Sequence, residues 1–280
     1  MNQKVERILR KYKSKREVGV EEFSLNLDRI YRGEEEKRLF DIRWRSFFES
    51  DRYNSLVFKR IGNNLEYLSE SWIPTKKDNR PPLLLLFGNP APHSVVSRMY
   101  FAYEGKGKEH RVWRIFREVG LLEFEGLNLV SNGSLFGGSE SIKKRFYDLD
   151  YKSPFRLAMV VYFSMPSPPS EPKWSGVGGL HKLFGEKALR IIEREEQKRI
   201  KRIISSFLPK KGRIITFQKD AYNGVKEINS PAYSLNLALE GKLKSRCRFN
   251  KKVEVIGVPP TRFLQGQKAK LVLKNAIKGI

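Results

Sequence analysis

Short runs of consecutive apolar residues recur through the last two thirds of the chain. Each has the length of a strand and none alternates with polar residues, which is typical of strands buried on both faces. They are Leu83–Phe87, Leu157–Phe163, Arg213–Phe217 and Lys252–Val258. Between and after them, apolar residues recur at helical spacing over His110–Leu122, Glu186–Phe207 and Gln267–Ile277. Strands separated by helices predict a mainly parallel sheet covered on both faces.

The first 75 or so residues have a different pattern. Met1–Arg16 and Glu34–Ser50 are expected to be helices, Asn54–Leu68 is ambiguous, and the polar, proline-containing Ile73–Pro82 is typical of a linker. We therefore expect an α/β protein of two parts: a helical N-terminal extension over residues 1–75, and an α/β domain over residues 76–280. The domain is expected to be a three-layer α/β/α structure around a short, mainly parallel four-stranded central sheet.

Composition adds an expectation about partners. The chain has 55 Lys and Arg against 31 Asp and Glu, a formal net charge of +24 with a pI near 10.1. Such a charge attracts polyanions, and the two common targets are phosphate backbones and anionic membrane surfaces, of which the first is favoured here. The mixture of Lys, Arg, Glu and Ile is common in proteins of thermophiles, but that enrichment raises Glu along with Lys and does not explain the surplus.

No apolar run has the length of a membrane span, and the charged N-terminus does not have the pattern of a secretory signal. One cysteine, Cys247, and three scattered histidines argue against a disulfide, a zinc site or an iron–sulfur cluster. We expect a cytoplasmic monomer with no metal, no organic cofactor and no membrane partner.

Three of the predicted strands end in conspicuous residues, and sites in open α/β sheets form beyond the carboxyl ends of strands. The three segments are Gly88-Asn89-Pro90, Met165-Pro166-Ser167-Pro168-Pro169 and Pro259-Pro260-Thr261-Arg262-Phe263. Each could also be an ordinary strand-ending turn. A glycine-rich segment, Gly176–Gly179, lacks the Lys-Ser/Thr of a phosphate-binding loop.

In order and spacing, these segments resemble the uracil-DNA glycosylase superfamily, closest to its mismatch-specific branch, across roughly residues 82–280. Asn89-Pro90 is similar to the branch's Gly-x-Asn-Pro motif, and Phe101 has the spacing of its base-stacking Phe. The segment His110–Phe116 resembles the following family helix. Two later segments complete the resemblance: Leu208–Tyr222, and Val258-Pro259-Pro260-Thr261, where the family has His-Pro-Ser or Asn-Pro-Ser.

The resemblance implies an enzyme that flips a damaged base out of DNA and hydrolyses its N-glycosidic bond. Asn89 would position the attacking water, with Gly88 and Pro90 shaping the turn, and Phe101 would stack on the flipped base. Phe263 or Leu264 would fill the gap in the duplex, and Arg262 would hold a phosphate. Phe101, Phe263 and Leu264 could instead be core residues. The remaining expected DNA contacts are Arg111, Thr261 and Lys268.

One departure from the family pattern concerns the chemistry itself. Pro259 stands where the family has its final His or Asn, and a proline side chain cannot donate a hydrogen bond to the leaving base. His93 and Thr261 are possible substitutes, although the simpler interpretation of His93 is a surface-loop residue, since nothing pairs with it locally. The alternative function is therefore a catalytically inactive nucleic-acid-binding module that retains the fold and the basic face. A metal-dependent nuclease is disfavoured because the sequence has no Asp…Glu-x-Lys set on paired strands.

Basic residues gather near these motifs. Residues 241–280 hold eleven Lys and Arg and one acidic residue, Glu254. Two further clusters are Lys106, Lys108, Arg111, Arg114 and Arg117, and Lys143-Lys144-Arg145. We expect phosphate contacts from the clusters that flank the motifs, although a charge run can also be an ordinary solvated face. The mixed charges of Glu193–Arg202 are expected to form such a solvated helix face.

Overall fold

The computed structural model describes residues 9–11, 19–102, 109–126 and 139–278 of a mixed α/β protein. The chain forms two compact units. The first unit contains residues 1–71, 89–100 and 163–199, and the second contains residues 72–88, 101–162 and 200–280. Along the sequence, the first change from one unit to the other falls between Ser71 and Trp72, close to the expected boundary at residue 75. Two later segments, residues 89–100 and 163–199, also belong to the first unit.

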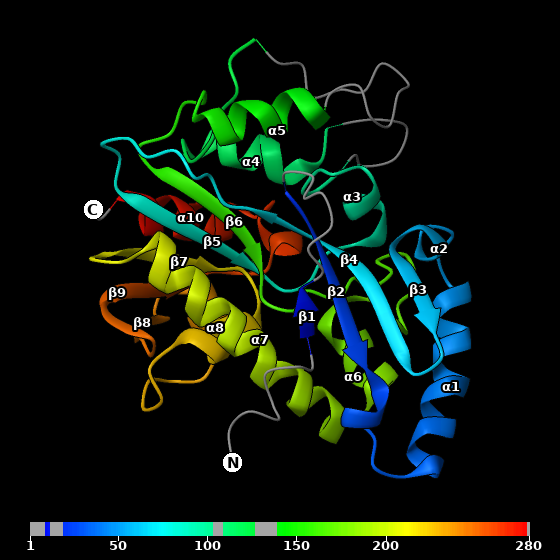
Figure 1. The fold of residues 1–280 in the computed structure, drawn as a ribbon. Coiled ribbons are helices and arrows are strands. Elements are labelled where there is room, and N and C mark those ends of the chain that lie inside the picture. The colour runs from blue at the N-terminus through cyan, green and yellow to red at the C-terminus, as the bar shows by residue number, and fades with distance from the viewer. Residues whose placement is uncertain (1–8, 12–18, 103–108, 127–138, 279–280) are drawn as a thin grey trace. The chain divides into compact units, whose positions relative to one another are not determined.

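The second unit is built around the predicted parallel strands (Figure 1). They are β5 (Pro82–Phe87), β6 (Arg156–Val161), β7 (Gly212–Thr216) and β9 (Asn250–Gly257). They lie in the order β6-β5-β7-β9, and each neighbouring pair is parallel. The four strands and their direction are therefore confirmed. The sequence did not predict β8 (Lys244–Cys247), which pairs antiparallel with β9.

Helices precede or follow these strands, and those that begin at Arg111, Glu186 and Gln267 lie in the predicted places. The elements are α4 (Arg111–Glu118), α5 (Ser139–Asp148), α7 (Glu186–Phe207), α8 (Lys219–Val225), α9 (Leu235–Leu239), the short 3₁₀ helix η2 (Thr261–Phe263) and α10 (Gln267–Lys278). The long helix α7 has the predicted bounds, because its apolar residues keep helical spacing over its whole length.

The expectation of a helical N-terminal extension is wrong for most of the described residues. The first unit contains α1 (Glu34–Glu49) as predicted, but it also contains an antiparallel sheet, in which β2 and β3 both pair with β4, and β1 pairs with β2. These strands are β1 (Leu9–Lys11), β2 (Val20–Asn26), β3 (Phe58–Ile61) and β4 (Asn64–Trp72). The rest of the expected Met1–Arg16 helix lies outside the described residues. Shorter helices complete the unit: η1 (Leu27–Arg29), α2 (Asn54–Val57), α3 (Pro92–Val96) and α6 (Gly176–Phe184).

Cross-strand packing explains why these residues form strands. Phe23 of β2 is the register partner of Tyr67 of β4, and the two rings stack at 5.4 Å between centroids. Leu25 pairs with Leu65 in the same sheet, and both side chains are fully buried. Such pairs stabilise a sheet through contacts distant in sequence, which a local pattern does not show.

A charged network lies buried at the same sheet and corrects the expectation for Glu193–Arg202. The Glu196 side chain is 0 % exposed and the Arg199 side chain 11 % exposed, with Arg199 Nε 2.6 Å from Glu196 Oε2. The other carboxylate oxygen of Glu196 accepts hydrogen bonds from the backbone N–H of Ser164, at 2.7 Å, and from its hydroxyl. Because the Ser164 proton is used in this way, the Tyr67 hydroxyl is the donor in its 2.9 Å bond to Ser164.

The electrostatics of this network follow from its burial. Burial raises the pKa of Tyr67, and the neighbouring Glu196 carboxylate acts in the same direction. Burial lowers the pKa of Arg199, but the carboxylates of Glu196 and Glu21 more than offset this, so that the pKa is raised. The expectation of a solvated face is therefore wrong for Glu195, Glu196 and Arg199, whereas Arg194, Lys198, Lys201 and Arg202 are exposed as expected.

The glycine-rich segment has a structural explanation, because it forms the start of α6, where Gly178 and Gly179 have different surroundings. A Cβ atom on Gly179 would lie 1.8 Å from the carbonyl oxygen of Trp174, whereas one on Gly178 would meet nothing within 4 Å. We expect Gly179→Ala to destabilise the protein by about 1–3 kcal/mol, since backbone atoms cannot move aside cheaply. The matched variant Gly178→Ala should be neutral or stabilise by about 0.5–1 kcal/mol. Urea denaturation measures both changes, and equal midpoints for the two variants would contradict the packing argument.

Candidate active site at the carboxyl ends of the parallel strands

The order of the strands reverses at β5, so the carboxyl ends of β5 and its neighbours are where a ligand is expected. The chain passes from β5 to β6 on one side and then to β7 on the other side of β5, and ligands of open α/β sheets bind where the order reverses in this way. Gly88 follows β5 and Gln218 follows β7. A Cβ atom on Gly88 would lie only 3.0 Å from Cγ of Gln218, so glycine lets the two strand ends approach closely.

Aromatic rings line the same strand ends in the second unit. Phe87 stacks on Phe217 with 4.8 Å between centroids, and Phe101 meets the ring of Phe87 edge-on at 5.0 Å. The ring of His110, at the start of α4, lies 5.2 Å from that of Phe101. The structure therefore places Phe101 beside the end of the first parallel strand. It is only partly exposed, so both a stacking role and a packing role are compatible with its position.

The backbone of Phe101 is strained. Its φ is +48°, in the left-handed region that aromatic residues rarely adopt. The indole N–H of Trp113 donates a 3.1 Å hydrogen bond to the Phe101 carbonyl and helps to hold this conformation. Strain of this kind is often found at binding sites, where surrounding contacts fix a side chain in a required direction.

Asn89 and Pro90 belong to the first unit, where hydrogen bonds fix the Asn89 amide. Nδ2 donates to the carbonyl oxygen of Met165 at 3.2 Å and to the hydroxyl of Ser167 at 2.8 Å. Because a carbonyl oxygen can only accept, the amide orientation is defined and Oδ1 points away from these partners. Pro90 is buried, and its carbonyl oxygen accepts a 3.0 Å bond from the Ser167 N–H. The first two predicted motifs, Asn89-Pro90 and Met165–Pro169, are thus brought together.

In the segment after β9, the two candidate wedge residues differ in the exposure of their side chains. Phe263 is 37 % exposed, and the guanidinium of Arg262 lies 5.0 Å from the centre of its ring. Leu264 is 0 % exposed, which corrects the expectation that it can fill a gap in a duplex, since its side chain is in the core. Thr261 is partly exposed and Lys268, in the first turn of α10, is exposed. Pro259 is buried.

The basic clusters differ in how far their charges are already paired. Lys270 Nζ lies 2.6 Å from Glu118 Oε2, Arg117 forms two hydrogen bonds with Glu109, and Lys143 is buried. Arg111 begins α4 and is partly exposed. Lys106 and Lys108 lie outside the described residues. The exposed basic residues after residue 240 are Lys242, Lys244, Arg246, Lys251, Lys252, Arg262, Lys268, Lys274 and Lys278.

His93, a possible substitute for the missing family side chain, lies in the first unit on α3. It is partly exposed, and its ring centroid is 6.2 Å from that of Tyr53. Burial lowers the pKa of His93, and the Asp51 carboxylate opposes this shift. A neutral imidazole is therefore favoured near pH 7, which is less suited than a cation to stabilise a departing base.

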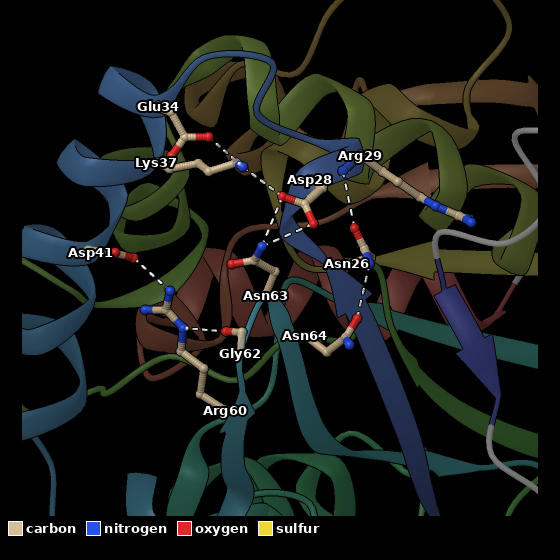
Figure 2. A network of polar contacts seen from close by, with 10 residues as sticks. All are labelled: Asn26, Asp28, Arg29, Glu34, Lys37, Asp41, Arg60, Gly62, Asn63 and Asn64. Atoms are coloured by element: carbon tan, nitrogen blue, oxygen red, sulfur yellow. Dashed lines mark hydrogen bonds and ion pairs between the residues drawn. The ribbon is translucent and has the colours of Figure 1, made fainter.

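A pocket of about 300 Å³ lies in the first unit, between α1 and the β3–β4 hairpin. Figure 2 shows the polar contacts around it. Its charged groups are already paired with one another. Lys37 Nζ lies 2.7 Å from Asp28 Oδ1 and 3.0 Å from Glu34 Oε1, and Arg60 lies 2.8 Å from Asp41 Oδ1. Asn63 Nδ2 donates to both Asp28 oxygens, at 3.0 and 3.1 Å. We interpret this network as a structural connection between helix and hairpin.

Sequence reasoning missed Gln218 and the hydrogen bonds of Asn89, although it had singled out the segment Met165–Pro169 that supplies them. Gln218 caps α8 by accepting a 2.9 Å bond from the Ala221 N–H. A Gln or Asp directly after a predicted strand and before a helix is a recognisable cap, so this residue could have been found. The bond from Asn89 to Met165 joins residues 76 positions apart and has no local signal.

Comparisons with known proteins add no family: no protein-family model and no curated protein matches the sequence. Within the described residues, no helix is both long and apolar enough to cross a membrane. The same part of the chain has no group of three or more His, Cys, Asp or Glu side chains placed to hold a metal ion.

Proposed function

We propose that this protein is a monofunctional DNA glycosylase that flips a deaminated or mismatched base out of duplex DNA and hydrolyses its N-glycosidic bond. The substrate base would be uracil, hypoxanthine, xanthine or mispaired thymine, in base excision repair. The single observation that carries the proposal is the Asn89 amide. Its Nδ2 is held by the Met165 carbonyl and the Ser167 hydroxyl, so that Oδ1 is oriented to accept a hydrogen bond from water.

The chemistry fits what an amide can do. An amide is too weak a base to remove a proton from water, but it can align water with a sugar carbon whose bond to the base is already breaking. The proposal requires Phe101 to stack on the flipped base, a contact worth about 1–3 kcal/mol in other nucleic-acid complexes. It also requires the expected three-layer arrangement of helices around the parallel strands. We expect the protein to act as a monomer without a metal or cofactor.

One observation favours the alternative, a binding module without catalytic activity. Pro259 is buried where the resembling family has a His or Asn, and its side chain offers no hydrogen bond to the departing base. Loss of one such donor typically slows an enzyme by about 10²–10³-fold. Under this alternative the protein would bind the same duplexes and release nothing.

A panel of duplexes distinguishes the two functions. Each carries one uracil, hypoxanthine, xanthine or G·T mismatch, and alkali cleaves the strand wherever a base has been removed. With enzyme in excess, the glycosylase should give cleaved strand from at least one duplex, and an undamaged duplex is the control. Tight binding of all duplexes without cleavage would support the binding module instead.

Binding itself is expected to depend strongly on salt. If the exposed side chains of Lys244, Arg246, Arg262 and Lys268 each neutralise one phosphate, log Kd should change with log salt with a slope of about 4. Affinity would then fall by about a hundredfold between 50 and 200 mM salt. Fluorescence anisotropy with a labelled duplex measures this slope.

Two variants test which residues account for the slope of log Kd against log salt. Lys268→Ala should lower it by about one, whereas Lys59→Ala, an exposed lysine on β3 in the first unit, should leave it unchanged. Equal slopes for the wild-type protein and Lys268→Ala would remove this residue from the interface.

A further inference from the structure

A set of basic residues in the second unit lies at the amino ends of the parallel strands, opposite the candidate site. We call it the amino-end cluster, and its members are Lys210, Lys211, Arg248, Lys251 and Lys252. Two of them directly precede β7, two lie at the start of β9, and one lies in the turn between β8 and β9. Because β7 and β9 are parallel neighbours, with Gly212 paired to Val253, the cluster gathers at one end of the sheet.

The two strand starts that carry the lysines are fixed to one another. Asn250 Nδ2 donates a 3.0 Å hydrogen bond to the Leu208 carbonyl, which joins the first residue of β9 to the turn before β7. Lys211 and Lys252 each directly precede one member of the Gly212–Val253 pair. Since neighbouring strands lie about 4.8 Å apart, the backbones of these lysines are held close together on a rigid base.

Little acidic charge balances the cluster. Lys251 forms an ion pair with Glu227, but within the described residues the three other lysines of the cluster have no carboxylate partner. The acidic residue of β9, Glu254, is already bound, because Arg213 Nε lies 2.7 Å from its Oε2. Like charges held this close repel one another, and a polyanion relieves the repulsion.

The surroundings of the cluster favour duplex DNA over other polyanions. Small phosphates prefer the backbone N–H groups of a helix N-terminus, whereas α7 ends just before β7, and the Ala276 carbonyl in the last turn of α10 accepts a 2.6 Å bond from Arg213. Single strands prefer open aromatic rings on which bases stack. Here the Arg248 guanidinium lies over the ring of Phe249, 5.4 Å from its centre. Long positive side chains without such groups suit the outward phosphates of a duplex.

A duplex bound at the carboxyl ends of the strands cannot also reach this cluster without a sharp bend. A strand rises about 3.3 Å per residue, so Lys252 lies about 17 Å from Gly257, where β9 ends and the chain continues toward Arg262. Duplex DNA is stiff over such a distance, since its persistence length is about 150 bp. The cluster is therefore suited to a different duplex segment.

We propose that the amino-end cluster binds a second segment of duplex DNA, so that one protein molecule holds two segments at once. The inference rests on the proposed function only for the first contact, at the carboxyl ends of the strands. The second contact involves phosphates alone and takes no part in base release. It would let the protein pass from one DNA segment to another without release into solution.

Lysine acetylation during a titration tests where each duplex binds. A short duplex with a U·G pair is added to the wild-type protein at low salt, exposed lysines are acetylated, and mass spectrometry measures the modification at each position. We expect full protection of the cluster lysines to require two equivalents of duplex. Lys187, an exposed lysine of the first unit, is the control and should react equally throughout. Full protection of Lys268 and of the cluster by one equivalent would overturn the inference, because one duplex would then contact both ends.

Capture of a second duplex gives an independent measurement. Protein is bound to a duplex on beads, a fluorescent duplex is added, and the captured fluorescence reports molecules that hold both. The double variant Lys211→Ala, Lys252→Ala should lower capture by about tenfold or more, because two phosphate contacts are lost, and leave binding to the beads nearly unchanged. The matched variant Lys182→Ala, Lys187→Ala removes two exposed lysines of the first unit and should change neither. No capture by the wild-type protein, or equal capture by the cluster variant, would overturn the inference.

The two proposals fail separately. Base release by the wild-type protein without capture of a second duplex would reject the second surface and retain the glycosylase. Capture that is lost in the cluster variant, without release of any base by the wild-type protein, would retain the second surface and reject the glycosylase.

Discussion

Replacing Asn89 by alanine is expected to slow base excision by about 10²–10³-fold, the usual loss when one fixed polar group at the reacting atoms is removed. Without the amide, nothing in the proposed mechanism orients water toward the sugar. Asn89 does not contact the DNA backbone in this proposal, so duplex affinity should be nearly unchanged. Single-turnover rates at saturating enzyme, measured on the lesion that the wild-type protein excises best, separate the two effects.

Two further variants distinguish orientation from mere presence of a polar group. Asn89→Asp places a carboxylate oxygen against the Met165 carbonyl, where Nδ2 now donates at 3.2 Å, so the side chain should turn away and the rate should stay low. Ser167→Ala removes one of the two anchors and should cause a smaller loss. Thermal unfolding checks that each variant is folded. An Asn89→Ala rate equal to the wild-type rate would exclude Asn89 from the reaction.

Replacing Glu196 by glutamine is expected to lower the free energy of unfolding by about 3–5 kcal/mol, because it breaks a buried ion pair and removes the carboxylate that is hydrogen-bonded to the Arg199 guanidinium. The partner is Arg199, whose side chain is 11 % exposed. A glutamine would also put an N–H donor against either the guanidinium or the Ser164 N–H, both of which need an acceptor. Urea denaturation at neutral pH measures the loss.

The control for this prediction lies on the same helix. Glu186 forms an i,i+4 pair with Arg190, and both side chains are 69 % exposed. Glu186→Gln should therefore cost no more than about 0.5 kcal/mol. If Glu196→Gln lowered the free energy of unfolding as little as Glu186→Gln does, the buried network would not contribute to stability.

The parallel part of the fold could be predicted because its signals are local. Strands such as Leu83–Phe87 are continuous apolar runs, and α7 keeps helical spacing from end to end. The antiparallel strands of the first unit could not be recognised in the same way. In β2, the polar Ser24 is buried between Phe23 and Leu25, so the alternation expected of a half-exposed strand is absent.

The segment Asn54–Leu68, which the hydrophobic pattern leaves ambiguous, contains a turn signal. Gly62-Asn63 joins β3 to β4 as a two-residue hairpin connection, and Gly62 has a φ of +56°, which glycine adopts at no steric cost. A Gly-Asn pair between two short apolar segments predicts a hairpin. The ambiguous segment Asn54–Leu68 could have been divided there.

The candidate site was predictable in part for the same reason. Strand ends can be located from the sequence, so Asn89 could be proposed as a site residue, whereas Phe101 was proposed from its spacing in the family resemblance. Sequence could not distinguish Phe263, which is exposed, from its neighbour Leu264, which is buried, because adjacent apolar residues look alike without tertiary contacts. The hydrogen bonds that orient Asn89 depend on such contacts as well.

We propose that this protein releases a base from DNA, and direct detection of the free base is the simplest test of this proposal. Wild-type protein in excess is incubated with the four lesion duplexes, and the small-molecule fraction is analysed by mass spectrometry. We expect free uracil, hypoxanthine, xanthine or thymine from at least one duplex, in an amount equal to the abasic sites formed. Bound duplex with no free base from any of the four would contradict it.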